Sequence, residues 1–123
     1  MESVNVFDSE FELMNMIWDN NPIRIRELIE KAEQERRWKR TTVYTMIKRL
    51  SNRGVVKYED RFVTALFCRQ DIQLMKISEF IRKYYMDDVD RFVQDINMTF
   101  KLSGEEPRKK DVQKVSSYIG TGG

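Results

Sequence analysis

Apolar residues recur every three or four positions in three consecutive segments of the first half of the chain. This spacing predicts three short amphipathic helices. The apolar positions of the first segment are Phe11, Leu13, Met14, Ile17 and Trp18. Those of the second are Ile25, Leu28, Ile29 and Ala32, and those of the third are Val43, Met46, Ile47 and Leu50. Because each helix has one apolar stripe, the three helices must pack on one another to bury them.

Local signals mark the ends of these helices. Ser9, followed three residues later by Glu12, predicts a capping box at the start of the first helix. Pro22 should end that helix, because the residue before a proline avoids the helical conformation. Trp38 is expected to fill the gap between the second and third helices. Gly54 is expected to close the third helix in a left-handed conformation.

A β-hairpin should follow the three helices. Residues 55–58 and 62–68 are rich in β-branched and aromatic side chains, which predicts two strands joined by a turn at residues 59–61. The order helix, helix, helix, hairpin is that of a winged helix-turn-helix. In that architecture the third helix enters the major groove of DNA and the hairpin, or wing, flanks it. We therefore expect a mainly α fold with a small β-hairpin over residues 1–70.

The third helix, at about residues 40–53, has a polar face suited to DNA. Thr41, Thr45 and Lys48 should point away from its apolar stripe. Hydroxyl groups can bond to base edges, and cations can contact phosphates. The candidate DNA-binding residues of this helix and the hairpin are Arg40, Thr41, Thr42, Tyr44, Thr45, Lys48, Arg49, Lys57 and Arg61. For this helix alone, a solvated basic face would be the simpler interpretation.

The distribution of charge favours the DNA-binding interpretation. The whole chain has a formal net charge of only +2. Residues 36–61, however, contain nine basic and two acidic residues, which leaves thirteen basic and eighteen acidic residues elsewhere. Positive charge concentrated around one helix and the hairpin after it is typical of a nucleic-acid-binding protein.

From residue 71 onwards, apolar residues continue at helical spacing in segments too apolar to be solvated. The positions expected at a dimer interface are Leu74, Ile77, Phe80, Ile81, Tyr84, Val89, Phe92, Val93 and Ile96. A weaker stripe follows Pro107, at residues 112–119. These helices could simply enlarge the core. We favour a helical dimerisation region over residues 71–123, because a protein that reads DNA with one short helix needs a second copy.

The composition argues against an enzyme. The chain has no histidine and one cysteine, Cys68, so Ser–His and Cys–His catalysis are excluded, and we expect no metal or other cofactor. The five glycines form no phosphate-binding loop. No apolar run reaches the roughly 18 residues of a membrane span, and no secretory signal opens the sequence. We therefore expect a cytoplasmic protein without membrane insertion.

Two motifs resemble those of the penicillinase repressor family (BlaI/MecI type). The first is FDSEFELMNMIWDN, in which the matching residues are Glu12, Met14, Ile17 and Trp18. The second is WKRTTVYTMIKRLSNRGVV, in which the matching residues are Trp38, Val43, Thr45, Ile47, Arg49, Leu50, Arg53 and Gly54. The resemblance extends along most of the chain, including the order of three further helices after the wing.

The resemblance implies a homodimeric repressor of double-stranded operator DNA that regulates antibiotic resistance. It also implies inactivation when a membrane-bound sensor protease, triggered by a β-lactam, leads to cleavage in the dimerising region. The family is cut at an Asn–Phe bond, which corresponds here to Thr99 and Phe100, so Thr99 departs from the family pattern. The alternative is that Thr99 and Phe100 end a helix and pack. Copper sensing is not implied, because this chain lacks the paired cysteines of the copper-responsive branch.

Two other functions stay open. One is a winged-helix regulator with a small-molecule effector in its C-terminal half. The other is a protein-interaction module that uses the winged fold as a docking surface for an acidic partner. The salt dependence of duplex binding separates them, because release of several counterions indicates DNA binding and argues against the interaction module.

Overall fold

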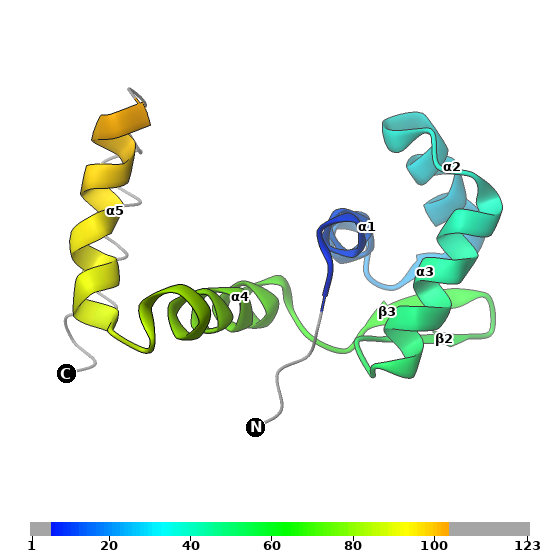
Figure 1. The fold of residues 1–123 in the computed structure, drawn as a ribbon. Coiled ribbons are helices and arrows are strands. Elements are labelled where there is room, and N and C mark those ends of the chain that lie inside the picture. Colours follow the sequence, from blue (N-terminus) through cyan, green and yellow to red (C-terminus); the bar gives the residue numbers. More distant parts are fainter. Residues whose placement is uncertain (1–5, 104–123) are drawn as a thin grey trace. The chain divides into compact units, whose positions relative to one another are not determined.

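The computed structural model describes residues 6–103, which form five helices and three short strands (Figure 1). In chain order the elements are α1 (Asp8–Asp19), β1 (Ile23–Arg24), α2 (Ile25–Arg36), α3 (Arg40–Asn52), β2 (Val56–Glu59), β3 (Phe62–Ala65), α4 (Arg69–Tyr85) and α5 (Val89–Ser103). The chain divides into two compact units, and the division falls within α4, after Ile77. The predicted mainly α fold with a small hairpin is confirmed.

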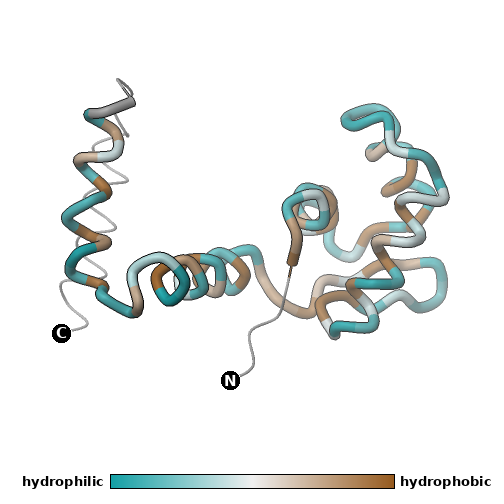
Figure 2. The backbone as a smooth tube through the Cα atoms, viewed as in Figure 1, coloured by the Kyte–Doolittle hydropathy of each residue, from teal (hydrophilic) through white to brown (hydrophobic). Residues whose placement is uncertain are grey.

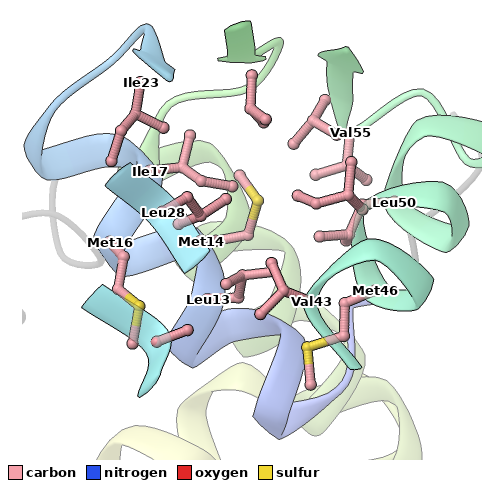
Figure 3. Packing of buried hydrophobic residues seen from close by; sticks show 14 of the residues in the cluster. Leu13, Met14, Met16, Ile17, Ile23, Leu28, Val43, Met46, Leu50 and Val55 are labelled. Carbon is pink, nitrogen blue, oxygen red and sulfur yellow. The ribbon is translucent and has the colours of Figure 1, made fainter. Parts of the chain in front are cut away.

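The first unit encloses one hydrophobic core. Its labelled side chains come from α1, β1, α2, α3 and the residue before β2, and they converge on a common interior (Figure 3): Leu13, Met14, Met16, Ile17, Ile23, Leu28, Val43, Met46, Leu50 and Val55. Trp38 is half-buried and packs against this cluster, as predicted. The three predicted stripes therefore do pack on one another.

The sheet is antiparallel, with the strand order β1-β3-β2. The predicted hairpin is confirmed, although β3 ends at Ala65, three residues earlier than expected. Its turn consists of Asp60 and Arg61, which have φ angles of 53° and 68°. A two-residue hairpin loop often needs φ above zero at both positions, which Asn-Gly usually supplies. Here an aspartate and an arginine take that conformation. α3 lies against β2, so the helix and the wing form one surface (Figure 1).

The predicted capping box at the start of the first helix is wrong. Helix α1 begins at Asp8, and the Phe7 N–H donates to the Glu10 carboxylate at 3.0 Å. Ser9 therefore lies inside the helix, and Glu12 forms an ion pair with Arg36 at 3.2 Å instead. Glu10 is also bonded to Arg53, a long-range contact that local spacing does not encode. The other end signals hold: α1 ends at Asp19, and Gly54 has a φ of 77°.

The second unit contains the end of α4 and helix α5. Met86 and Asp87 have φ angles of 49° and 68° and separate the two helices. The Tyr85 hydroxyl donates to the Asp95 carboxylate at 3.0 Å, and the Tyr85 and Phe92 rings lie 5.5 Å apart. Apolar and polar residues alternate in short blocks along both helices (Figure 2). The stripe predicted at residues 112–119 lies outside the described residues.

The helices of residues 6–103 include none with the length and apolar character needed to cross a membrane.

Candidate nucleic-acid interface

The outward face of α3 is polar and exposed, as its periodicity predicts. Thr41, Thr45 and Lys48 are exposed to solvent, whereas the apolar stripe of the same helix is buried. Thr42 is half-buried and lies off the exposed face. The sequence of α3 contains no acidic residue, so no carboxylate of this helix opposes an approaching phosphate. This face can offer hydroxyl groups and a cation to the floor of a major groove.

The two exposed threonines of α3 are linked to each other. The Thr45 hydroxyl donates to the backbone oxygen of Thr41 at 2.9 Å, one helical turn earlier. A hydroxyl has one proton to donate and two lone pairs to accept. Because the proton of Thr45 is engaged, its oxygen faces solvent as an acceptor. Among base edges in the major groove, the donors are the amino groups of adenine and cytosine.

Tyr44 joins α3 to the wing. Its ring lies 6.4 Å from the ring of Tyr58 on β2, and the Arg40 guanidinium lies over it at 5.9 Å. Burial raises the pKa of the Tyr58 hydroxyl, and the neighbouring Tyr44 raises it further, whereas the charge of Arg61 acts in the opposite direction. Tyr58 is therefore neutral at physiological pH and able to donate a hydrogen bond.

The two candidate cations of the wing differ in their surroundings. Lys57 forms an ion pair with Glu59 on the same strand at 2.7 Å, and both side chains are exposed. The hydrogen bond between them raises the pKa of Lys57 and lowers that of Glu59. Arg61 lies in the turn and makes no ion pair with any residue from 6 to 103. Arg61 is therefore the wing cation more available to a phosphate.

A buried carboxylate holds the C-terminal end of α3 to α1. Both terminal nitrogens of the Arg53 guanidinium donate to Glu10, which is 3% exposed, and one of these bonds measures 2.9 Å. Burial raises the pKa of Glu10, but the hydrogen bonds from Arg53 and the Phe7 N–H, together with the charges of Arg53 and Arg49, outweigh it and lower the pKa. The positive charge of Arg49 therefore helps to keep Glu10 ionised. The contact of Arg49 with the DNA backbone stays a prediction.

Two arginines that sequence reasoning did not single out lie beside the predicted cations. Arg24 and Arg26 line a groove of about 600 Å³, whose other lining residues come from α2, α3 and the hairpin: Ile25, Glu27, Ile29, Arg40, Tyr44, Tyr58, Asp60, Arg61 and Phe62. The signal was present in the run Ile23-Arg24-Ile25-Arg26, in which buried isoleucines alternate with exposed arginines. Over four residues such alternation is too short to distinguish a strand from the start of a helix.

The residues expected at a dimer interface have three degrees of exposure. Ile81 is buried, and Phe92, Val93 and Ile96 are half-buried. The remaining five are each at least 40% exposed, which is high for large apolar side chains: Leu74, Ile77, Phe80, Tyr84 and Val89.

The candidate cleavage position lies in the last turns of α5. The Thr99 hydroxyl donates to the backbone oxygen of Asp95 at 2.8 Å. Phe100 is half-buried and lines a hollow of about 180 Å³ together with Phe80 and Phe92. The bond between Thr99 and Phe100 is therefore inside a formed helix.

No group of three or more His, Cys, Asp or Glu side chains that could hold a metal ion occurs between residues 6 and 103.

The chain is similar to proteins of known family and structure. The family model described as penicillinase repressor matches residues 7–115. The penicillinase repressor of Bacillus licheniformis is 28% identical over 105 residues, which cover 82% of each chain. The methicillin resistance regulatory protein MecI of Mammaliicoccus sciuri is 26% identical over 109 residues, which cover 85% of this chain and 89% of MecI.

Solved structures match part of the chain. The solution structure of the DNA-binding domain of the repressor BlaI is similar with a TM-score of 0.52 and 27% identity. The monomeric form of Bacillus licheniformis BlaI in complex with the blaP half-operator is similar with a TM-score of 0.50 and 27% identity. Each match covers 57% of this chain and 90% of the solved one. With a family model that spans residues 7–115, the chain belongs to the penicillinase repressor family.

Proposed function

We propose that the chain is a homodimeric transcriptional repressor that binds operator DNA through α3 and the wing. The observation that supports this function best is the exposed face of α3, where Thr41, Thr45 and Lys48 stand on a helix without acidic residues. The fold that carries this face is similar to BlaI in complex with the blaP half-operator. Relatives over most of the chain are named as repressors or resistance regulators.

Each part of the surface has a role in the proposal. Thr45 accepts a hydrogen bond from the amino group of an adenine or cytosine, because its own proton is bonded to Thr41. Lys48 contacts a base edge or the adjacent phosphate, and Arg40 contacts the backbone. Arg61 and Lys57 bring the wing to the backbone beside the groove.

The test of the reading face uses Thr45→Ala and Lys48→Ala with the duplex that the intact chain selects from a random-sequence library. Loss of a base contact should weaken binding by about 1–3 kcal/mol and relax the preference at one position of the site. The control is Gln34→Ala, an exposed residue of α2, which should change neither affinity nor preference. Unchanged affinity and preference in both α3 variants would show that α3 does not read the DNA.

The salt dependence of the same binding distinguishes a DNA-binding protein from a protein-interaction module. The logarithm of the binding constant should fall linearly with the logarithm of the salt concentration, with a slope of about −0.9 for each phosphate neutralised. A chain that binds an acidic protein and no duplex would support the interaction module.

The dimer in the proposal is formed by α4 and α5. Five of the large apolar side chains expected at the interface are exposed in the single chain, and a second copy would cover them. Two linked reading helices would also extend the site and raise its affinity, because the second binding event becomes intramolecular.

Proteolysis is the off-switch that the family resemblance implies for this dimer, through a membrane-bound sensor protease. A cut between Thr99 and Phe100 would separate the end of α5 from the rest of the apolar stripe. At about 25 cal/mol per Å² of apolar surface, losing a few hundred Å² per protomer would remove several kcal/mol of dimer stability. The helix must first open locally, because the bond lies inside α5.

Mass spectrometry of the protein from its native cells, before and after a cell-wall antibiotic, tests this off-switch. A fragment ending at Thr99 is the expected product. An intact chain under full derepression would mean that another inducer acts, and a small-molecule effector would then be the next candidate.

A further inference from the structure

Four arginines from separate segments line one groove of the first unit. Arg24 comes from β1, Arg26 from α2, Arg40 from α3 and Arg61 from the hairpin turn. Two carboxylates, those of Glu27 and Asp60, also line the groove, so the cations exceed the anions by two. An uneven set of charges in a concave surface focuses the electrostatic potential and attracts anions.

Aromatic rings hold two of these guanidinium groups. The Arg24 guanidinium lies over the Phe62 ring at 5.5 Å, and the Arg40 guanidinium lies over the Tyr44 ring at 5.9 Å. None of the four arginines makes an ion pair within residues 6–103. A guanidinium above a ring makes no hydrogen bond through that contact, so its N–H groups can still donate to two oxygens of a phosphate.

The groove adjoins the exposed face of α3 that contains Thr41, Thr45 and Lys48, which we call the reading face. Arg40 and Tyr44 belong to α3 and also line the groove. In a helix-turn-helix the helix before the reading helix crosses the DNA backbone. Arg26 lies in the first turn of α2, the helix before α3, and Arg24 directly precedes that helix. Their positions therefore suit a strand of the backbone that runs alongside the reading face.

We propose that this groove binds successive backbone phosphates of the operator, with Arg24 and Arg26 as two cations of the DNA interface beyond those of α3 and the wing. The inference rests on the proposed function and deepens it. A phosphodiester chain carries one charge per nucleotide, so cations spread over four segments suit a row of phosphates better than one compact anion. The contacts carry no sequence information, because phosphates are the same at every base pair.

The experiment measures binding of the full chain to its selected duplex, and to a scrambled duplex of equal length, over a range of salt concentrations. Each of Arg24→Gln and Arg26→Gln should reduce the magnitude of the salt slope by about 1.8, because a dimer loses one phosphate contact in each protomer, and the double variant should reduce it by about 3.6. Affinity should fall by the same factor for both duplexes, which leaves the specificity ratio unchanged. Thermal unfolding of each variant checks that the fold is intact.

The matched control is Arg36→Gln, at the other end of α2. Arg36 is paired with Glu12 of α1 and does not line the groove, so this variant loses the same charge from the same helix and should keep the parental slope. Arg24→Lys with Arg26→Lys should also keep the slope, because the charges are retained.

Two results would overturn the inference. A folded Arg24→Gln/Arg26→Gln variant with the parental slope would show that no phosphate contact is lost. A change in the specificity ratio would show that the arginines read bases instead. Failure of the proposed function is a separate outcome, because the parental chain itself would then bind no duplex with a salt-dependent affinity.

Discussion

The two units of this chain treat their apolar side chains differently. Every buried hydrophobic residue of the described range except Ile81 lies in the first unit, where α1, α2, α3 and the sheet enclose them. In the second unit Phe80, Tyr84 and Val89 are 40% to 61% exposed. Both units expose some large apolar side chains, but within the described residues the first unit encloses seventeen buried hydrophobic residues and the second only one.

Helix α4 contains both buried and exposed apolar side chains. Its first turns are tied to the first unit, since Ile72 is buried in the core and Arg69 forms an ion pair with Asp19 at 2.8 Å. Leu74 and Ile77, two and five residues after Ile72, are exposed. The first unit therefore includes the start of α4, and a truncated chain meant to keep the winged core should end at Ile77.

The largest effect on dimer stability is expected for a charge placed among the exposed apolar side chains of α4 and α5, such as Ile77. Ile77→Asp should weaken the dimer by about 3–5 kcal/mol, because a carboxylate without a partner would be buried in the interface of each protomer. Sedimentation equilibrium should then show a monomer with an unchanged circular dichroism spectrum. Gln73→Asp, an exposed position of the same helix, is the control and should stay dimeric. A dimeric Ile77→Asp variant would remove this part of α4 from the interface.

In the first unit, a buried apolar side chain should contribute much more to the stability of the fold than an exposed one. In the chain that ends at Ile77, Leu50→Ala should lower the free energy of unfolding by about 2–5 kcal/mol, because Leu50 is fully buried and leaves a cavity. Leu74→Ala is the matched substitution at a side chain that is 56% exposed, and it should cost less than about 0.5 kcal/mol in that chain. Urea denaturation measures both. Equal costs would contradict this difference between buried and exposed apolar side chains.

A smaller effect is expected at the ion pair that joins α1 to α3. Glu10→Gln should lower the free energy of unfolding by about 1–3 kcal/mol, because Arg53 loses a charged acceptor in a largely buried site. Glu12→Gln, which removes the exposed pair with Arg36, should cost about 1 kcal/mol or less. If the two variants are equally stable, the Glu10 pair contributes no more than an exposed one.

The Glu10 carboxylate should also make the free energy of unfolding depend on pH, and the sign of that dependence follows from its pKa. The folded pKa of Glu10 lies below its ordinary value of 4.5, so its contribution to stability is fully present above that pH. The contribution is lost as the pH falls through the lower, folded pKa. Urea denaturation between neutral and acidic pH should therefore show a steeper loss of stability in the parental chain than in Glu10→Gln. Parallel curves would contradict the assignment.

Periodicity in the sequence was sufficient to predict the core and the orientation of α3. The stripes of α1, α2 and α3 follow from spacing alone, because a helix with one apolar face has one way to bury it. The exposure of Thr41, Thr45 and Lys48 follows from the same geometry.

Some features that local patterns missed involve long-range contacts. At the start of α1, Glu10 accepts from the nearby Phe7 N–H and also from Arg53, which is 43 positions away. Strand β1 has two residues, which are too few to show a period, and it exists because Ile23 pairs with Val63. The same pairing places Arg24 beside the hairpin, where it lines the groove with Arg26, Arg40 and Arg61.

Sedimentation velocity of the intact chain at micromolar concentration, alone and with its selected duplex, tests the central claim most directly. A dimer is expected in the free state, and a complex of two chains per duplex is expected with DNA. The chain that ends at Ile77 should be a folded monomer that binds the same duplex much more weakly, because the avidity of the dimer is lost. A monomeric intact chain, or one that binds no duplex, would contradict the account.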